Sequence, residues 1–202
     1  MAETAIDFID VGKRYGDHIA LGGVTLAIPA GQFVALVGGS GSGKTTLLKT
    51  INRLVTPDRG AVHIAGEDVS GRPAPLLRRQ IGYVFQEVGL FPHLTVAENI
   101  AMTPRLLGWP AARIAARVSE LLELVALPAA MGARLPAELS GGQRQRVGVA
   151  RALAAEPGVL LMDEPFGALD PVTRDTLGTE VRDLHERLGL TTVMVTHDMG
   201  EA

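Results

Sequence analysis

The sequence GGSGSGKT at residues 38–45 is the most informative stretch of this 202-residue chain. It fits the pattern Gly-x-x-x-x-Gly-Lys-Ser/Thr, in which glycines let successive backbone N–H groups converge on phosphate oxygens. It follows the apolar run FVALV at residues 33–37 and precedes KTTLLKTINRL at residues 44–54. A phosphate-binding loop needs this context, because the amino terminus of the following helix adds positive potential. The stretch therefore predicts an α/β fold built around a nucleotide site.

The positions of this loop have distinct expected roles. Lys44 would reach the β- and γ-phosphates of a nucleotide, and Thr45 would offer its hydroxyl to magnesium. The alternative, a flexible glycine loop with an incidental lysine, does not account for the strand and helix on either side. We expect ATP, bound with Mg²⁺, to contact Gly38, Gly39, Ser40, Gly41, Ser42, Gly43, Lys44, Thr45 and Thr46.

A second chemical signal is VLLMDEP at residues 159–165, an apolar strand that ends in two carboxylates. Neighbouring side chains on an extended segment diverge, so the two acids can have different roles. Asp163 is expected to hold magnesium, directly or through water. Glu164 is expected to orient and deprotonate the attacking water beside the γ-phosphate. The alternative is a strand end with two solvated acids.

The composition is that of an ordinary globular chain. A hydrophobic content of 47% allows a sizeable core, which predicts one domain or one domain with an inserted subdomain. The net charge of −3, without a long block of like charge, argues against a nucleic-acid partner. The absence of cysteine excludes disulfides and thiolate metal sites. The acidic start MAETAIDFID lacks the apolar region of a secretory signal.

An uncharged stretch at residues 19–43 is long enough to be tested as a membrane span. Pro29, Gln32 and several glycines argue against a lipid-facing helix. We therefore expect two core strands around a turn at Pro-Ala-Gly, and a chain that does not itself cross a membrane.

Apolar runs and helical periodicity alternate along the chain. Strands are predicted at residues 6–11, 24–28, 33–37, 61–65, 81–85, 158–163 and 191–195. Helices are predicted at residues 43–54, 96–102, 110–127, 141–155 and 171–188. Such alternation indicates a mostly parallel sheet with helices on both faces. The Ala- and Leu-rich residues 88–157 are expected to form an inserted helical subdomain.

The stretch LSGGQRQRV at residues 139–147 has the form of a capped helix start, since Ser140 can cap and the glycines leave the first amides bare. Together with the other motifs, it resembles the signature of the ATP-binding cassette (ABC) family, LSGGQ. In that family two cassettes meet head to tail, and the signature of each closes over the ATP held by the other. The resemblance implies that Ser140, Gly141, Gly142 and Gln143 act in trans, in a dimer with two-fold symmetry.

The remaining motifs of the ABC family follow in order. Tyr15 stands where the family stacks an aromatic ring on adenine, and Gln86 where a glutamine contacts magnesium and the hydrolytic water. Asp170 ends GALD, which matches a loop that crosses the dimer interface, although many members have serine in place of Gly167. His197 matches the switch histidine, which reaches the γ-phosphate. Without the resemblance, these positions would be interpreted as edge packing, a turn residue, a helix cap and a structural histidine.

The resemblance covers essentially the whole chain and implies the fold of an ABC nucleotide-binding domain over residues 1–202. That fold is a P-loop NTPase with a RecA-like core, an antiparallel β subdomain and an inserted helical subdomain. Members usually continue into further strands and a C-terminal helix, whereas this sequence stops five residues after His197. We therefore expect a chain truncated at its C-terminus.

Two features favour an importer ATPase. Residues 87–109 resemble the region where importer cassettes receive a coupling helix of the permease. Residues 51–60, 75–101 and 151–171 are most similar to ATPases of the quaternary-amine group, which take up glycine betaine, choline or carnitine. Phe85 and Arg144 depart from that group, which often has isoleucine and glutamine there. ATPases of polar amino acid and methionine importers share much of this sequence and remain an alternative.

The importer interpretation implies a set of partners. They are transmembrane permease subunits, a second and identical cassette, and, indirectly, an extracytoplasmic solute-binding protein. The chain would then be peripheral, at the cytoplasmic face of the cell membrane. A soluble ABC ATPase acting on DNA ends or ribosomes is less favoured, because many of those proteins carry two cassettes in one chain or a long coiled-coil insertion.

Overall fold

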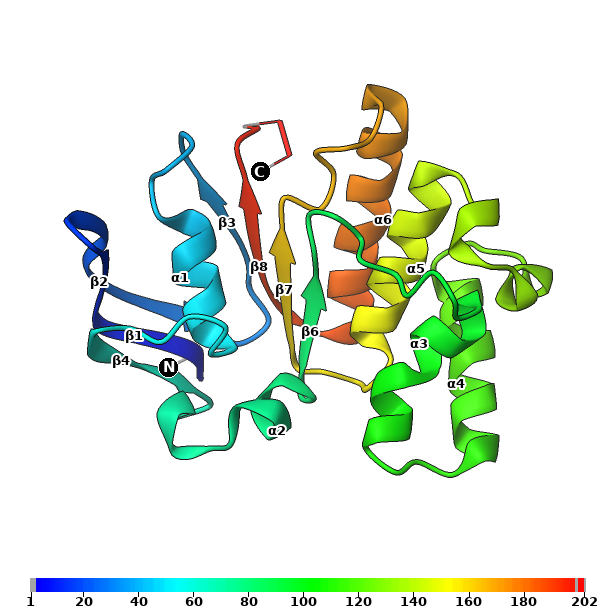
Figure 1. Ribbon diagram of the computed structural model, residues 1–202, viewed down its shortest axis with the longest axis horizontal. Helices are drawn as coiled ribbons and strands as arrows, with labels where there is room; N and C mark the ends of the chain where they lie inside the picture. Colours follow the sequence, from blue (N-terminus) through cyan, green and yellow to red (C-terminus); the bar gives the residue numbers. More distant parts are fainter. Residues whose placement is uncertain (1–2, 199, 202) are drawn as a thin grey trace.

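The computed structural model describes residues 3–198 and 200–201, and Figure 1 shows them as two β-sheets and a group of helices set side by side. An antiparallel sheet has the order β2-β1-β4-β5 and comprises β1 (Thr4–Tyr15), β2 (His18–Pro29), β4 (Arg59–Ile64) and β5 (Glu67–Asp68). A parallel sheet has the order β3-β8-β7-β6 and comprises β3 (Phe33–Val37), β6 (Ile81–Val84), β7 (Val159–Asp163) and β8 (Thr191–Thr196).

The helix at residues 44–51 lies between the two sheets, whereas the long helices between residues 96 and 188 lie on the other side of the parallel sheet (Figure 1). The helices are α1 (Lys44–Ile51), α2 (Ala74–Arg78), α3 (Val96–Leu106), α4 (Ala111–Leu124), α5 (Gly141–Leu153) and α6 (Pro171–Leu188). Three 3₁₀ turns lie at Val69–Gly71, Ala129–Ala133 and Pro136–Glu138. The segment between β6 and β7 contains α3, α4, α5 and two of these turns, as expected for a helical insert.

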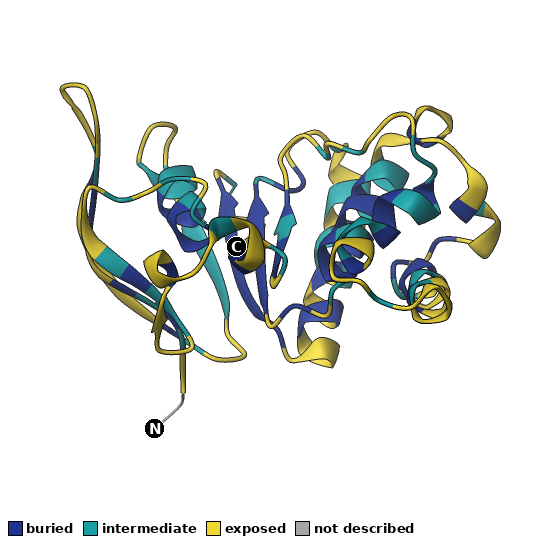
Figure 2. Ribbon diagram, turned by 60° about the horizontal axis from the view of Figure 1, so that its bottom comes forward, coloured by how far each residue is buried: buried dark blue, intermediate teal, exposed yellow. Residues whose placement is uncertain are grey.

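The parallel sheet separates two hydrophobic cores, because successive side chains of a strand point to opposite faces. Leu160 and Met162 of β7 pack with the apolar sides of α5 and α6. Val159 and Leu161 face the other way, toward α1 and the inner face of the antiparallel sheet. In Figure 2, β6, β7 and β8 of the parallel sheet are largely buried and β3 is half-buried, whereas the antiparallel sheet is largely exposed. The carboxyl ends of the parallel strands are thereby fixed from both faces.

The long helices begin where their sequences supply caps. Thr95 and Glu98 form a reciprocal capping box at the start of α3, and Asp170 accepts a hydrogen bond from the N–H of Thr173 at the start of α6. Gly189 ends α6 in a left-handed conformation, with φ of 61°. These local signals set the boundaries that the sequence predicted well.

The predicted fold is confirmed, with differences at the margins. The five predicted helices and seven predicted strands are present, but β1 and β2 extend into one long hairpin that runs to Tyr15 and His18. Their outer halves are rich in glycine and polar residues, so the apolar pattern that marks a strand is missing there. The short α2 and β5 were not predicted, because segments of five and two residues carry no measurable periodicity.

Candidate functional site

The phosphate loop lies between β3 and α1, at the carboxyl edge of the parallel sheet. The ammonium of Lys44 donates to the carbonyl oxygens of Gly38 and Gly39 at 2.7 and 2.8 Å, and to the Ser42 hydroxyl at 3.3 Å. The Lys44 side chain therefore folds back across the loop and links two of its backbone carbonyl oxygens. Gly43 adopts φ of 88° directly before α1. The remaining predicted phosphate contacts lie on the same turn and the first helical residues: Ser40, Gly41, Thr45 and Thr46.

The carboxylate of Asp163 lies at the end of β7, next to this loop. The Thr45 hydroxyl donates to Oδ1 at 2.8 Å, so the two predicted magnesium ligands are in direct contact. Oδ2 accepts a hydrogen bond from the Tyr83 hydroxyl at 3.1 Å and lies 3.4 Å from the Lys49 ammonium. Only 6% of Asp163 is exposed. A buried charge requires such partners, because an unpaired carboxylate in the interior is strongly unfavourable.

The sequence analysis did not single out Tyr83 or Lys49. Lys49 lies one helical turn after Thr45, and Tyr83 pairs with Leu161, so its side chain shares a face with Asp163 two residues further on. Burial, followed by the charge of Asp163, raises the pKa of the Tyr83 hydroxyl well above its usual range. The hydroxyl is therefore a stable donor. The strand register could have identified it only once the pairing of β6 with β7 was known.

Glu164 stands at the meeting point of three segments. Its backbone adopts φ of 45°, which is uncommon for a residue other than glycine and turns the chain sharply at the end of β7. Its Oε2 accepts a hydrogen bond from the Gln86 amide at 3.1 Å and lies 3.4 Å from Nδ1 of His197. The structure thus brings together the three predicted catalytic side chains. Backbone strain of this kind is found where surrounding structure fixes a functional side chain.

Magnesium fits this constellation of oxygen atoms. Mg²⁺ prefers hard oxygen ligands and is commonly bound by one or two carboxylates together with substrate phosphates and water. Thr45 and Asp163 provide a hydroxyl and a carboxylate at one point, and Gln86 provides an amide nearby. Among the described residues no group of three or more His, Cys, Asp or Glu side chains could hold a metal by itself.

Tyr15 lies at the tip of the β1–β2 hairpin and is 50% exposed. The hairpin touches the phosphate loop, since a Cβ atom built on Gly43 would lie 2.3 Å from the carbonyl oxygen of Ala20 in β2. The Lys13 ammonium lies 5.4 Å from the centre of the Tyr15 ring. This exposed ring belongs to the hairpin that touches the phosphate loop, and it is a suitable stacking surface for a base.

The signature motif occupies the start of α5. Ser140 and Gln143 form a reciprocal capping box, with distances of 3.2 and 2.9 Å. A Cβ atom built on Gly142 would lie 2.9 Å from Cγ2 of Thr173, so the motif packs on the first turn of α6, beside Asp170. The hydrogen bond from Thr173 lowers the pKa of Asp170. The signature and the predicted dimer loop are thus neighbours within one chain.

The phosphate loop and the signature do not meet in a single chain. Both lie at the upper edge in Figure 1, on either side of the ends of β7 and β8. Across residues 3–198 and 200–201, no hydrogen bond or ion pair joins residues 140–143 to residues 38–45. The phosphate loop and the signature are therefore two separate surfaces of the described part of the chain.

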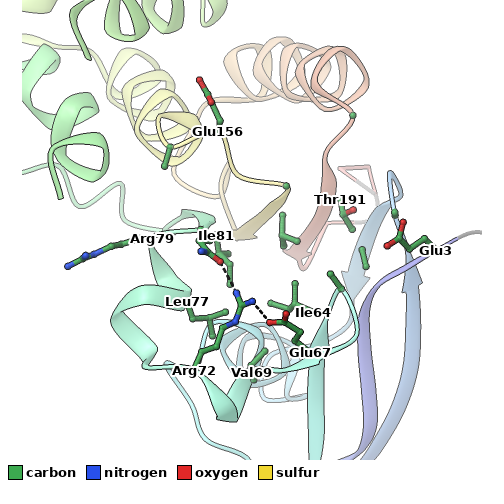
Figure 3. A pocket seen from close by; sticks show the side chains of 18 of the residues that line it. Glu3, Ile64, Glu67, Val69, Arg72, Leu77, Arg79, Ile81, Glu156 and Thr191 are labelled. Carbon is green, nitrogen blue, oxygen red and sulfur yellow. Dashed lines mark hydrogen bonds and ion pairs between the residues drawn. The ribbon is translucent and has the colours of Figure 1, made fainter. Parts of the chain in front are cut away.

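Two cavities lie away from the phosphate loop. The larger, about 790 Å³, lies at the amino ends of the parallel strands, where Figure 3 shows Arg72 directed toward Glu67. Arg72 also donates a hydrogen bond to the Gln80 side chain. Nucleotides bind at the carboxyl ends of parallel strands, so this cavity is not the nucleotide site. The second, about 420 Å³, is lined by Tyr83, Phe85 and residues of the following segment and of α3 and α5.

In the part of the chain that the structure describes, every helix is too short or too polar to span a membrane.

Comparison with known proteins identifies relatives along nearly the whole chain. The family model for ABC transporter matches residues 21–167. The glycine betaine uptake system ATP-binding protein YehX of Escherichia coli (strain K12) is 53% identical over 197 residues, which are 98% of this chain and 64% of that protein. The choline transport ATP-binding protein OpuBA of Bacillus subtilis (strain 168) is 52% identical, over 96% of this chain and 51% of that protein. The chain thus spans between half and two thirds of the length of these relatives.

The fold also matches solved structures. A dimeric structure of an ATP-binding cassette in a post-hydrolysis state, bound to ADP and Pi, superposes with a TM-score of 0.85 at 36% identity. The match covers 98% of this chain and 90% of that one.

Proposed function

The chain belongs to the ABC transporter family, and on that basis we propose that it is the ATP-hydrolysing subunit of an importer for a small quaternary amine such as glycine betaine, choline or carnitine. The observation that carries the hydrolytic part is the contact of Glu164 with both Gln86 and His197, directly beside the Thr45–Asp163 pair. This is a base placed next to the predicted position of a nucleotide γ-phosphate.

Each side chain has a defined task in ATP hydrolysis. Lys44 and the backbone amides of the loop hold the β- and γ-phosphates, and Tyr15 supports the adenine. Thr45, Asp163 and Gln86 would hold Mg²⁺, which neutralises charge on the phosphates when bound. Glu164 accepts the proton of the attacking water. Gln86 and His197 fix its carboxylate from two sides, and His197 is well placed to reach toward the γ-phosphate.

Catalysis is proposed to require two copies of the chain. The signature surface, Ser140 to Gln143, makes no hydrogen bond to its own phosphate loop among the described residues, and a symmetric dimer would place it over the loop of the partner. A dimeric arrangement of a related cassette with ADP and Pi supports this geometry. Asp170, packed beside the signature, would lie at the same interface. We propose a homodimer, because one chain supplies both halves of the interface.

The importer part rests on the relatives and on the second cavity. The E. coli protein is named for glycine betaine uptake and the B. subtilis protein for choline transport. The cavity beside Phe85 is lined in part by the segment directly after Gln86. Its largely apolar lining suits a short helix of a permease. The solute would be chosen by an extracytoplasmic binding protein and cross through the permease. The cassette would work at the cytoplasmic face of the membrane. A polar amino acid or methionine importer is the alternative.

The decisive experiment uses Glu164→Gln, tagged in its native cell. The substitution keeps ATP binding and lowers turnover by roughly 10²- to 10⁴-fold, the range for loss of a general base. Membranes solubilised with ATP and Mg²⁺ should yield a permease with several spanning helices, identified by mass spectrometry. The double variant Lys44→Ala/Glu164→Gln, which cannot hold ATP, serves as the matched control.

Recovery of the tagged protein only in the soluble fraction, together with ribosomal or DNA-repair proteins, would contradict the importer. Recovery with a permease whose binding protein selects amino acids would favour the alternative solute. Near-normal phosphate release by purified Glu164→Gln would remove this residue from the role of base.

A further inference from the structure

The two oxygens of the Asp163 carboxylate have different partners. Oδ1 faces the Thr45 hydroxyl at 2.8 Å, on the side of the phosphate loop. Oδ2 faces away from the loop and is approached by Tyr83 at 3.1 Å and Lys49 at 3.4 Å. The carboxylate is therefore anchored through Oδ2 and presents Oδ1 to the phosphate loop. Which oxygen is presented depends on the donors to Oδ2.

Of these two donors, Tyr83 imposes the firmer constraint. Tyr83 belongs to β6, which is paired in register with β7, so the backbone that carries its ring is fixed relative to Asp163. Its neighbour Phe85 packs against it with ring centres 4.5 Å apart. For Lys49, 35% of the side chain is accessible. Its contact is an ion pair without fixed direction.

Tyr83 also forms part of a surface on its other side. It lines the cavity of about 420 Å³ together with Phe85, Phe91 and Arg151. A single side chain thus touches the cavity wall and the carboxylate predicted to hold magnesium. Gln86, three residues later, reaches Glu164 from the same segment.

We propose that Tyr83 is a positioning residue for the magnesium site, whose hydroxyl anchors Oδ2 of Asp163 so that Oδ1 is presented toward Thr45 and the phosphate loop. The proposal rests on the proposed function, since it assigns Asp163 to magnesium. Hydrogen-bond partners one step behind a metal ligand typically contribute 10- to 100-fold to metal affinity or activity, because they fix the orientation of the ligand. The Tyr83 hydroxyl occupies such a place.

The first test measures nucleotide affinity rather than turnover. A fluorescent ATP analogue is titrated into wild-type protein and Tyr83→Phe, with Mg²⁺ and with EDTA. We expect the affinity in EDTA to be unchanged, and the gain in affinity on adding Mg²⁺ to fall about 10-fold in Tyr83→Phe. Phe85→Leu is the matched control, because it alters the neighbouring ring and the same cavity without touching Asp163. It should retain the full gain.

A purely structural role predicts a different result. Tyr83→Phe would then lower the melting temperature but keep the ratio of the two affinities, which would overturn the proposal. Equal losses in Tyr83→Phe and Phe85→Leu would overturn it too. A wild-type protein with no gain from Mg²⁺ would overturn the proposed function and the role of Tyr83 together. A normal wild-type gain that Tyr83→Phe retains would overturn the role of Tyr83 alone.

A second test needs no substitution at Tyr83. The chain has only two tyrosines, Tyr15 and Tyr83, so labelling with 3-fluorotyrosine gives two ¹⁹F signals, which Tyr15→Phe assigns. With nucleotide bound, addition of Mg²⁺ should shift the Tyr83 signal. A Tyr83 signal that ignores Mg²⁺ while nucleotide affinity rises would contradict the hydrogen-bonded link to the metal site.

Discussion

The phosphate loop and the signature turn each lie at the start of a helix, and they are stabilised in different ways. The phosphate loop depends on its surroundings: Lys44 bonds to loop carbonyls, and Gly43 presses against the backbone of Ala20 in another sheet. The signature turn is satisfied within its own helix, through Ser140 and Gln143. The first is held by contacts with another sheet, whereas the second satisfies its cap hydrogen bonds within its own helix, packs on α6 through Gly142, and leaves Ser140 and Gly141 exposed.

The largest expected effect comes from Lys44→Ala. The substitution removes the only cation of the loop and three hydrogen bonds that shape it. We expect nucleotide affinity to fall by more than about 100-fold, consistent with loss of several charge-assisted hydrogen bonds. Titration with a fluorescent ATP analogue measures this. Arg187→Ala, on the far end of α6, is the control for loss of a positive charge. Retained affinity in Lys44→Ala would mean that the loop does not hold the phosphates.

Ser140→Arg tests the signature turn. A long side chain at the exposed signature turn should block pairing of two chains, and ATP hydrolysis with it, because the surface can no longer approach a partner. Nucleotide affinity of the single chain should remain within about two-fold of wild type, since the substitution creates no contact with the phosphate loop. Pairing is measured by light scattering with ATP in a Glu164→Gln background. Loss of affinity in the isolated chain would show that the signature acts in cis.

This contrast also explains what the sequence could predict. The phosphate loop, the caps of α5 and α6, and the apolar strands are local patterns, and they were found in the right places. Tyr83 and Lys49 were missed, because their link to Asp163 depends on the alignment of β6 with β7 and on the packing of α1 against the sheet. A hydrogen bond across 80 residues leaves no spacing pattern in a single sequence.

A matched pair of glycine substitutions compares the phosphate loop and the signature turn through their effects on the free energy of unfolding. Gly43→Ala places a Cβ atom 2.3 Å from the carbonyl oxygen of Ala20, at φ of 88°, and should cost about 1–3 kcal/mol in free energy of unfolding. Gly141→Ala meets nothing closer than 3.9 Å and should change that free energy by less than about 0.5 kcal/mol. Urea denaturation gives both values. Equal costs would mean that the two loops are supported alike by their surroundings.

A smaller effect than that of Gly43→Ala is expected for Ser140→Ala, which removes one capping hydrogen bond from α5. The N–H of Gln143 loses its acceptor, and the free energy of unfolding should fall by about 1 kcal/mol, the typical contribution of a helix cap.

Ser140→Asp is the informative counterpart, because it keeps a capping oxygen but adds a negative charge where a phosphate of the partner would approach. It should preserve stability and still impair ATP-dependent pairing, whereas Ser140→Ala should lose stability with only a modest effect on pairing. If both variants paired normally, the signature amides would not face a phosphate. The turn would then be a helix cap and nothing more, as its self-contained hydrogen bonding allows when one chain is considered alone.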